Sequence, residues 1–174
     1  MVLLIGNHEE SFIKHNKSDV YDSFIRMFEV EPPKIGYVGF LKLGFCYEKK
    51  RDRANRTVLI ALNHGTSGGG YLPGYPINKC HEVFRWTSAD INIMGHLHKL
   101  VVDDKKINYV SQTDELVKKR RYFGISGSFL KTYVAGNTNY FEHKGRDEGD
   151  IGFLKCNMVI GDNIKIKLEK IKFD

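Results

Sequence analysis

The chain has 174 residues, of which 41% are hydrophobic and 28% charged, so it is long enough to bury a core and we treat residues 1–174 as one globular domain. It has no apolar run of the roughly 18 residues that cross a bilayer and no secretory signal, and its three cysteines form no CxxC pair; we therefore expect a cytoplasmic protein without a membrane partner. The net charge of +6 allows a polyanionic partner without establishing one.

The first third of the chain predicts one strand and two helices. The apolar run 2–5 is too short for a surface helix and is typical of a buried strand. A Gly-Asn-His-Glu turn follows, and 8–16 is expected to be helical with Phe12 and Ile13 inward. A second helix is predicted over 19–28, where Ser18 and Asp19 resemble a cap. Its inward face would carry Val20, Phe24, Ile25 and Phe28.

Strands dominate the remaining chain. A hairpin is predicted from segments 35–48 and 56–62, followed by a glycine- and proline-rich loop over 63–76. Segment 78–86 suggests a helix, with Cys80, Val83, Phe84 and Trp86 as its apolar positions. Further strands are expected at 90–95, 107–110, 122–126 and 129–134, and a closing hairpin at 152–160 and 163–173.

Basic residues cluster at 49–56 and at 117–121. Two readings stay open for these clusters. They could be solvated loops or sheet edges protected by lysine and arginine, which we favour, or a surface that contacts the phosphate backbone of a nucleic acid.

Polar side chains of the metal-ligand type follow three of the predicted strands. Asn7 and His8 follow 2–5, His64 follows 56–62, and His96 and His98 follow 90–95. Strand ends are where sites form in layered α/β folds. Imidazole combined with amide or carboxylate oxygen suits divalent Mn, Fe, Ni or Zn. Each motif alone is weak, but their conjunction predicts a shared metal site.

These motifs, "GNHE" at 6–9, "NHG" at 63–65 and "GHLH" at 95–98, resemble those of the calcineurin-like metallophosphoesterases. The resemblance implies an α/β fold in which two mixed β-sheets form a sandwich flanked by helices. It also implies two metal ions and hydrolysis of a phosphomonoester or phosphodiester, with nucleic acid among the candidate substrates.

By this resemblance, Asn7, His64 and His96 would bind one ion and His98 the other. His8 would be catalytic: it would contact the phosphate and, if protonated, assist the leaving oxygen. Glu9 has two interpretations, an orienting partner of His8 or an acid favoured by the start of a helix.

Two earlier motifs of that family, Asp-x-His and Gly-Asp-x-x-Asp, do not occur in this chain. Gly149-Asp150 and Gly161-Asp162 do not continue as the second motif requires and are read as turns. We therefore expect a fold that lacks its N-terminal strands, and a site completed by an upstream polypeptide or by self-association through the strand at 2–5.

Two alternatives to an enzyme stay open. The chain could be a catalytically inactive remnant that binds nucleic acid, or a structural subunit. The substrate is not readable, although the loops 65–74 and 129–149 are expected to border the pocket. His143, Lys144 and Arg146 could contact a phosphate or be solvated, and we favour solvation.

Overall fold

The computed structural model describes residues 2–16, 19–49, 52–66, 72–131, 133, 134, 136, 138, 143, 145 and 147–173. Its helices are α1 (Asn7–Asn16), α2 (Val20–Ile25) and α3 (Tyr75–Val83). Its strands are β1 (Leu3–Leu4), β2 (Lys34–Ile35), β3 (Val38–Lys49), β4 (Asp52–Asn63), β5 (Ile91–Met94), β6 (Val101–Val110), β7 (Leu116–Ile125), β8 (Gly152–Val159) and β9 (Lys165–Lys172).

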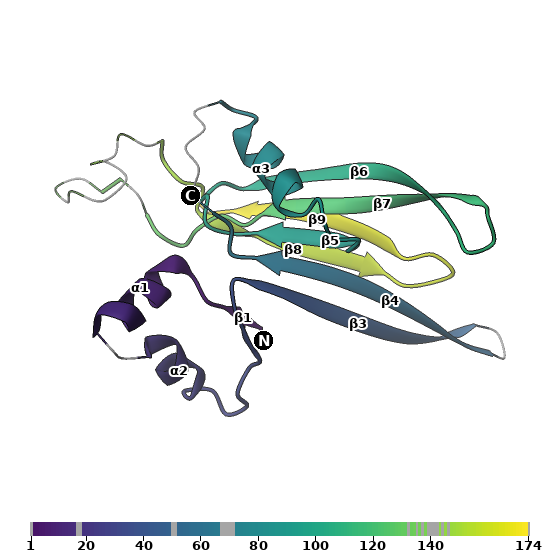
Figure 1. The fold of residues 1–174 in the computed structure, drawn as a ribbon, viewed down its shortest axis with the longest axis horizontal. Coiled ribbons are helices and arrows are strands. Elements are labelled where there is room, and N and C mark those ends of the chain that lie inside the picture. Colours follow the sequence, from purple (N-terminus) through teal and green to yellow (C-terminus); the bar gives the residue numbers. More distant parts are fainter. Residues whose placement is uncertain are drawn as a thin grey trace.

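The central feature is a mixed sheet of five strands in the order β3-β4-β5-β7-β6 (Figure 1). Its three inner strands, β4, β5 and β7, run parallel, and β3 and β6 pair antiparallel at the two edges. The α/β class predicted from the sequence is confirmed. Because β4 and β5 are parallel, the residues that follow them emerge at the same end of the sheet, where the carboxyl ends of both strands lie.

Both faces of this sheet are covered. Helix α3 packs on one face, where Cys80 and Phe84 are buried against Met94 and Phe123. The hairpin β8–β9 covers the other face, where Leu168 joins Ile91 in a second core. Within the described residues this second layer is an antiparallel hairpin, whereas the sequence analysis expected a second mixed sheet.

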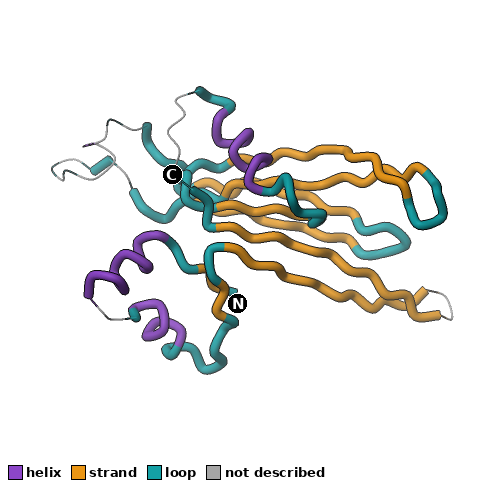
Figure 2. Tube along the Cα trace, in the orientation of Figure 1, coloured by secondary structure: helices purple, strands orange, loops and turns teal. Residues whose placement is uncertain are grey.

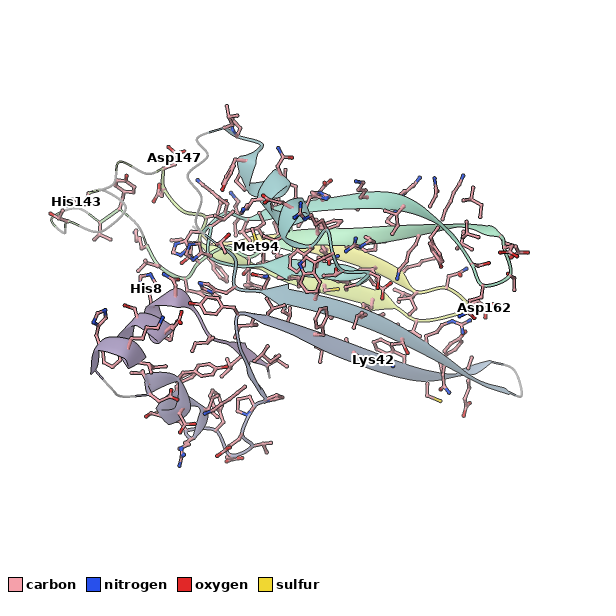
Figure 3. All side chains as sticks on the ribbon, in the orientation of Figure 1. His8, Lys42, Met94, His143, Asp147 and Asp162 are labelled. Atoms are coloured by element: carbon pink, nitrogen blue, oxygen red, sulfur yellow. The ribbon has the colours of Figure 1, made fainter. Side chains whose placement is uncertain are left out.

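The closing hairpin forms as predicted. Ile166 and Leu168 point toward the core while Lys165 and Lys167 are exposed, which is the alternation of a strand with one wet face. Its turn contacts the sheet, since Arg56 donates to the carbonyl of Asp162 from Nη2 (3.1 Å) and from Nε. Figure 3 shows Asp162 at the end of the molecule opposite His8.

Some expectations were wrong. No strand covers the described residues of 129–134, and Trp86 is exposed because α3 ends at Val83. Helix α2 is shorter than expected, with Ile25 buried but Val20 and Phe24 exposed. In α1, Phe12 is exposed as well. Asp19 caps α2 as predicted, accepting a hydrogen bond from Asp22 N at 2.7 Å, while Ser18 lies outside the described residues.

The N-terminal part stands beside the body that is formed by α3, the five-stranded sheet and the β8–β9 hairpin (Figure 2). Strand β1 pairs in parallel with β2 and forms a separate small sheet. Residues 2–5 are half-buried rather than buried. The Tyr21 hydroxyl donates to the carbonyl of Leu3 (2.6 Å) and so ties α2 to β1.

Candidate metal centre

Three side chains from distant parts of the chain meet at the end of the sheet where β4 and β5 finish. Asn7 Oδ1 lies 3.0 Å from His64 Nε2, and His64 Nε2 lies 3.1 Å from His96 Nδ1. The two imidazole rings are edge to face, with centroids 5.1 Å apart. Asn7 begins α1, His64 directly follows β4 and His96 follows β5. The structure thus brings together three of the four side chains predicted to bind metal.

The chemistry of these contacts is unusual because both converge on one nitrogen. His64 Nε2 carries either one proton or one lone pair, so at most one of the two contacts is a full hydrogen bond. Two ligands of one zinc-like ion are roughly 3–3.5 Å apart, because each lies about 2.1 Å from the metal. The two separations that involve His64 Nε2 fall in or near this range, and an amide oxygen with two imidazole nitrogens is a donor set that suits a borderline divalent ion.

Glycines within the three motifs allow this close approach. A Cβ on Gly6 would lie 2.9 Å from His64 Cε1. A Cβ on Gly65 would lie 3.0 Å from the carbonyl oxygen of Gly95 and 3.1 Å from His96 Cβ, and Gly65 has a φ of +93°. Side chains larger than hydrogen would therefore push the loops apart.

The turn after β5 has a strained backbone. His96 and His98 have φ values of 67° and 51°, in the left-handed region that costs non-glycine residues about 1–3 kcal/mol. Such strain persists only when neighbouring contacts hold it, and it concentrates at functional sites.

His98 occupies a different position from the other ligand candidates. Its Nδ1 is buried, and its carbonyl accepts a hydrogen bond from Asp150 N at 2.8 Å. In the described part of the chain, no three His, Cys, Asp or Glu side chains form a group that could hold a metal ion, so His64, His96 and His98 do not form one triad.

Asp150 anchors the histidine turn, which the sequence analysis did not foresee. Its carboxylate accepts hydrogen bonds from Leu100 N (2.7 Å) and Lys172 Nζ (2.6 Å). Burial alone would raise the pKa of Asp150, but these hydrogen bonds and the nearby ammonium groups lower it below its ordinary value. An isolated Gly-Asp pair gave no pattern from which this anchoring role could be read.

His8 directly follows Asn7 at the start of α1. His8 is exposed, and Figure 3 shows it on α1 on the side of the molecule where Met94 ends β5. Glu9 Oε2 accepts a hydrogen bond from Gly6 N at 3.1 Å, which supports the interpretation of Glu9 as an acid at a helix start.

The environment of His64 favours its neutral form. Partial burial lowers the pKa of this imidazole; Glu9 opposes the shift and His8 adds to it. Neutral imidazole is the form that binds metals. Tyr37 flanks the ring edge to face at 5.7 Å and is fixed by a hydrogen bond to Glu10, which raises the pKa of Tyr37 to about 12.

An apolar pocket of about 450 Å³ adjoins His64. Its walls come from β1, the start of α1 and helix α2, and they include Leu4, Tyr21 and Phe24. The side chain of Glu9 also reaches this pocket.

The basic cluster at 117–121 is largely committed to contacts within the fold. Arg121 is buried and donates to backbone carbonyls, Lys119 pairs with Asp90 at 2.6 Å, and Arg120 lies 3.5 Å from Asp104. For this cluster, the nucleic-acid interpretation is disfavoured.

Other expected contacts lie partly outside the described residues. Residues 50 and 51 of the other basic cluster lie outside the described residues, and so do residues 67–71 of the glycine-rich loop. Lys144 and Arg146 lie outside them too, whereas His143 is exposed.

No family model matches the chain, and no curated protein matches it. The resemblance to the calcineurin-like metallophosphoesterases therefore stays a prediction. Among the described residues, none of the helices is both long and apolar enough to cross a bilayer.

Proposed function

We propose that Asn7, His64 and His96 bind a divalent ion of the Mn, Fe, Ni or Zn type in a metal-dependent phosphoesterase of the calcineurin-like kind. The observation that supports the proposal is that two ligand atoms, from residues 57 and 32 positions away from His64 in the chain, both lie within 3.1 Å of His64 Nε2. The strained turn that carries His96 favours the same function, as does partial burial, which lowers the pKa of His64.

A bound divalent ion would polarise a phosphoryl oxygen and lower the pKa of a water molecule. The chain itself would contribute orientation and proton transfer. Exposed His8 would lie beside the phosphate ester and act on the leaving oxygen, while the small residues Gly6 and Gly65 keep the ligand-bearing loops together.

A second ion would need further ligands. His98 is the candidate for it, but two dications held by neutral donors would repel each other strongly. We propose that carboxylates from an upstream polypeptide, or from a second copy of this chain, complete the site. The pocket beside β1 supports this part of the proposal, because its apolar walls lead to His64. Isolated, the chain should then bind at most one ion.

The test measures metal content and hydrolysis in matched variants. We expect His64→Ala and His96→Ala to lose bound Mn or Zn in calorimetry and elemental analysis, whereas His15→Ala, an exposed residue late in α1, keeps it. His8→Ala should also keep the metal. Once the site is complete, His8→Ala should lower hydrolysis of an aryl phosphodiester by about 10²-fold or more.

Unchanged metal binding in both His64→Ala and His96→Ala would refute the centre. Parallel loss of metal and activity in His8→Ala would refute its role at the leaving group. Two fully occupied ions in the isolated chain would show that the ligand set is larger than Asn7, His64, His96 and His98.

A further inference from the structure

The outer face of the β8–β9 hairpin carries aromatic rings that the core does not use. Alternation along the strands sends Leu154 and Leu168 inward and leaves Phe153 and Phe173 on the opposite side. In the described part of the chain this outer face stays open, since Phe153 is 36% exposed and Phe173 is 47% exposed.

A third ring adds to this aromatic group. Phe129, which follows β7, is 76% exposed and lies with its ring centroid 6.1 Å from that of Phe173. The ring centroid of Phe153 also lies near that of Phe173, at 5.7 Å. The ring planes are inclined by 33° and 46°, so the rings are tilted rather than stacked in parallel, and all three residues are partly exposed.

The same face is positively charged further along the hairpin. Lys155, Lys165 and Lys167 point outward and are exposed. Glu169 is the carboxylate of this face among the described strand residues, and it pairs with Lys167 at 2.6 Å. The lysines therefore outnumber the acid and leave a positive surface beside the rings.

We propose that this aromatic and lysine-bearing face binds single-stranded nucleic acid. Exposed bases stack on aromatic faces, whereas a duplex keeps its bases paired and stacked inside. The lysines further along β8 and β9 would contact the phosphates of the nucleic acid. Charge argues against a second copy as the occupant, because pairing two such faces brings their lysines together.

The C-terminal end of β9 lies at the same end of the molecule as α1 and the loops after β4 and β5 (Figure 1). A single-stranded nucleic acid bound on this face would therefore lead toward the candidate metal centre. Binding itself uses neither metal nor the histidines, so it stands or falls independently of the proposed hydrolysis.

The experiment measures the fluorescence anisotropy of a labelled oligothymidine about 20 nucleotides long, with the intact chain in EDTA. We expect Phe173→Ala and Phe129→Ala each to weaken binding by roughly 5- to 100-fold. Lys165→Glu should weaken it and reduce the dependence on salt. Phe40→Ala is the matched control, since Phe40 is 49% exposed on β3 and packs against Trp86 instead.

Several results would overturn the proposal. These are no binding by the wild-type chain, equal binding by the phenylalanine variants, or a duplex of the same length bound as tightly. Sedimentation gives another: a wild-type dimer that Phe173→Ala converts to monomer would assign this face to self-association. Should Phe173→Ala fail to fold, Phe129→Ala provides the same test, because Phe129 lies outside the strands.

Discussion

Gly65 is the residue on which the geometry of the metal centre depends most directly. It follows His64, adopts a left-handed φ and packs against the carbonyl of Gly95 and the side chain of His96. Because that carbonyl belongs to the turn that presents His96, a methyl group at position 65 would separate two of the three proposed ligands.

We expect Gly65→Ala to lower the free energy of unfolding by about 2 kcal/mol or more, since the change adds backbone strain to a close contact. Metal affinity should fall as well. Urea denaturation and calorimetry measure the two effects. Gly44→Ala is the control, because a Cβ at Gly44 on β3 would meet no atom within 4 Å. Equal stability of the two variants would contradict this view of Gly65.

In strand β7, neighbouring basic residues have different environments. Its sequence places four cations in succession, yet Arg121 is buried while Arg120 stays exposed. Arg121 reaches the carbonyls of Ala89 and Phe84 and also the side chains of Thr87 and Asn92. It thereby supplies hydrogen-bond donors to the acceptors at the end of α3 and in the loop that leads into β5.

This network predicts very different costs for neighbouring substitutions. Arg121→Leu should destabilise the fold by about 3 kcal/mol, because several buried acceptors lose their donor. Arg120→Ala, which loses only an exposed pair with Asp104, should cost less than about 1 kcal/mol. Chemical denaturation of both variants measures the difference. Similar costs would mean that Arg121 is not the main donor of this network.

Sequence patterns predicted elements best where one periodicity dominated. The strands β4 and β9 and the helix α3 follow apolar patterns, and all three formed. Trp86 and Phe24 were assigned inward because they match a helical spacing, but the helices end or lie at the periphery there. Tertiary position, which no local pattern encodes, decided those side chains.

The candidate site was predictable in part for the same reason. Asn7, His64 and His96 follow strands and lie in short motifs, so their meeting could be anticipated from the sequence. The anchoring of the turn by Asp150 could not, because it depends on a contact between segments about 50 residues apart.

At the scale of the whole molecule, the N-terminal part and the body of α3, sheet and hairpin differ in how much apolar surface they bury. Helices α1 and α2 keep Phe12 and Phe24 exposed, and only Ile25 among their apolar residues is fully buried. The body has cores on both faces of its sheet. Asn7 therefore belongs to the less protected part, while His64 and His96 belong to the body.

Hydrogen exchange should reveal this difference. We expect amides of α1 and α2 to exchange through local opening, at rates well above those of β4 and β5, which should exchange only on global unfolding. Mass spectrometry of peptides from these segments measures the rates. Addition of Zn or Mn should slow exchange in α1 specifically, because Asn7 would link this helix to the body. Uniform protection across the chain would contradict the division.

The wide separation of the three ligand atoms along the chain also has a kinetic consequence. Asn7 is 57 residues from His64, and His64 is 32 residues from His96, with the parallel pairing of β4 and β5 in between. Parallel pairing requires closure of a long loop, and the entropy of this loop is lost before any stabilising contact forms. Such contacts therefore form slowly. We expect the ligand atoms to assemble late in refolding, after the local hairpins. A newly synthesised chain would then acquire its capacity for metal as one of its last folding events.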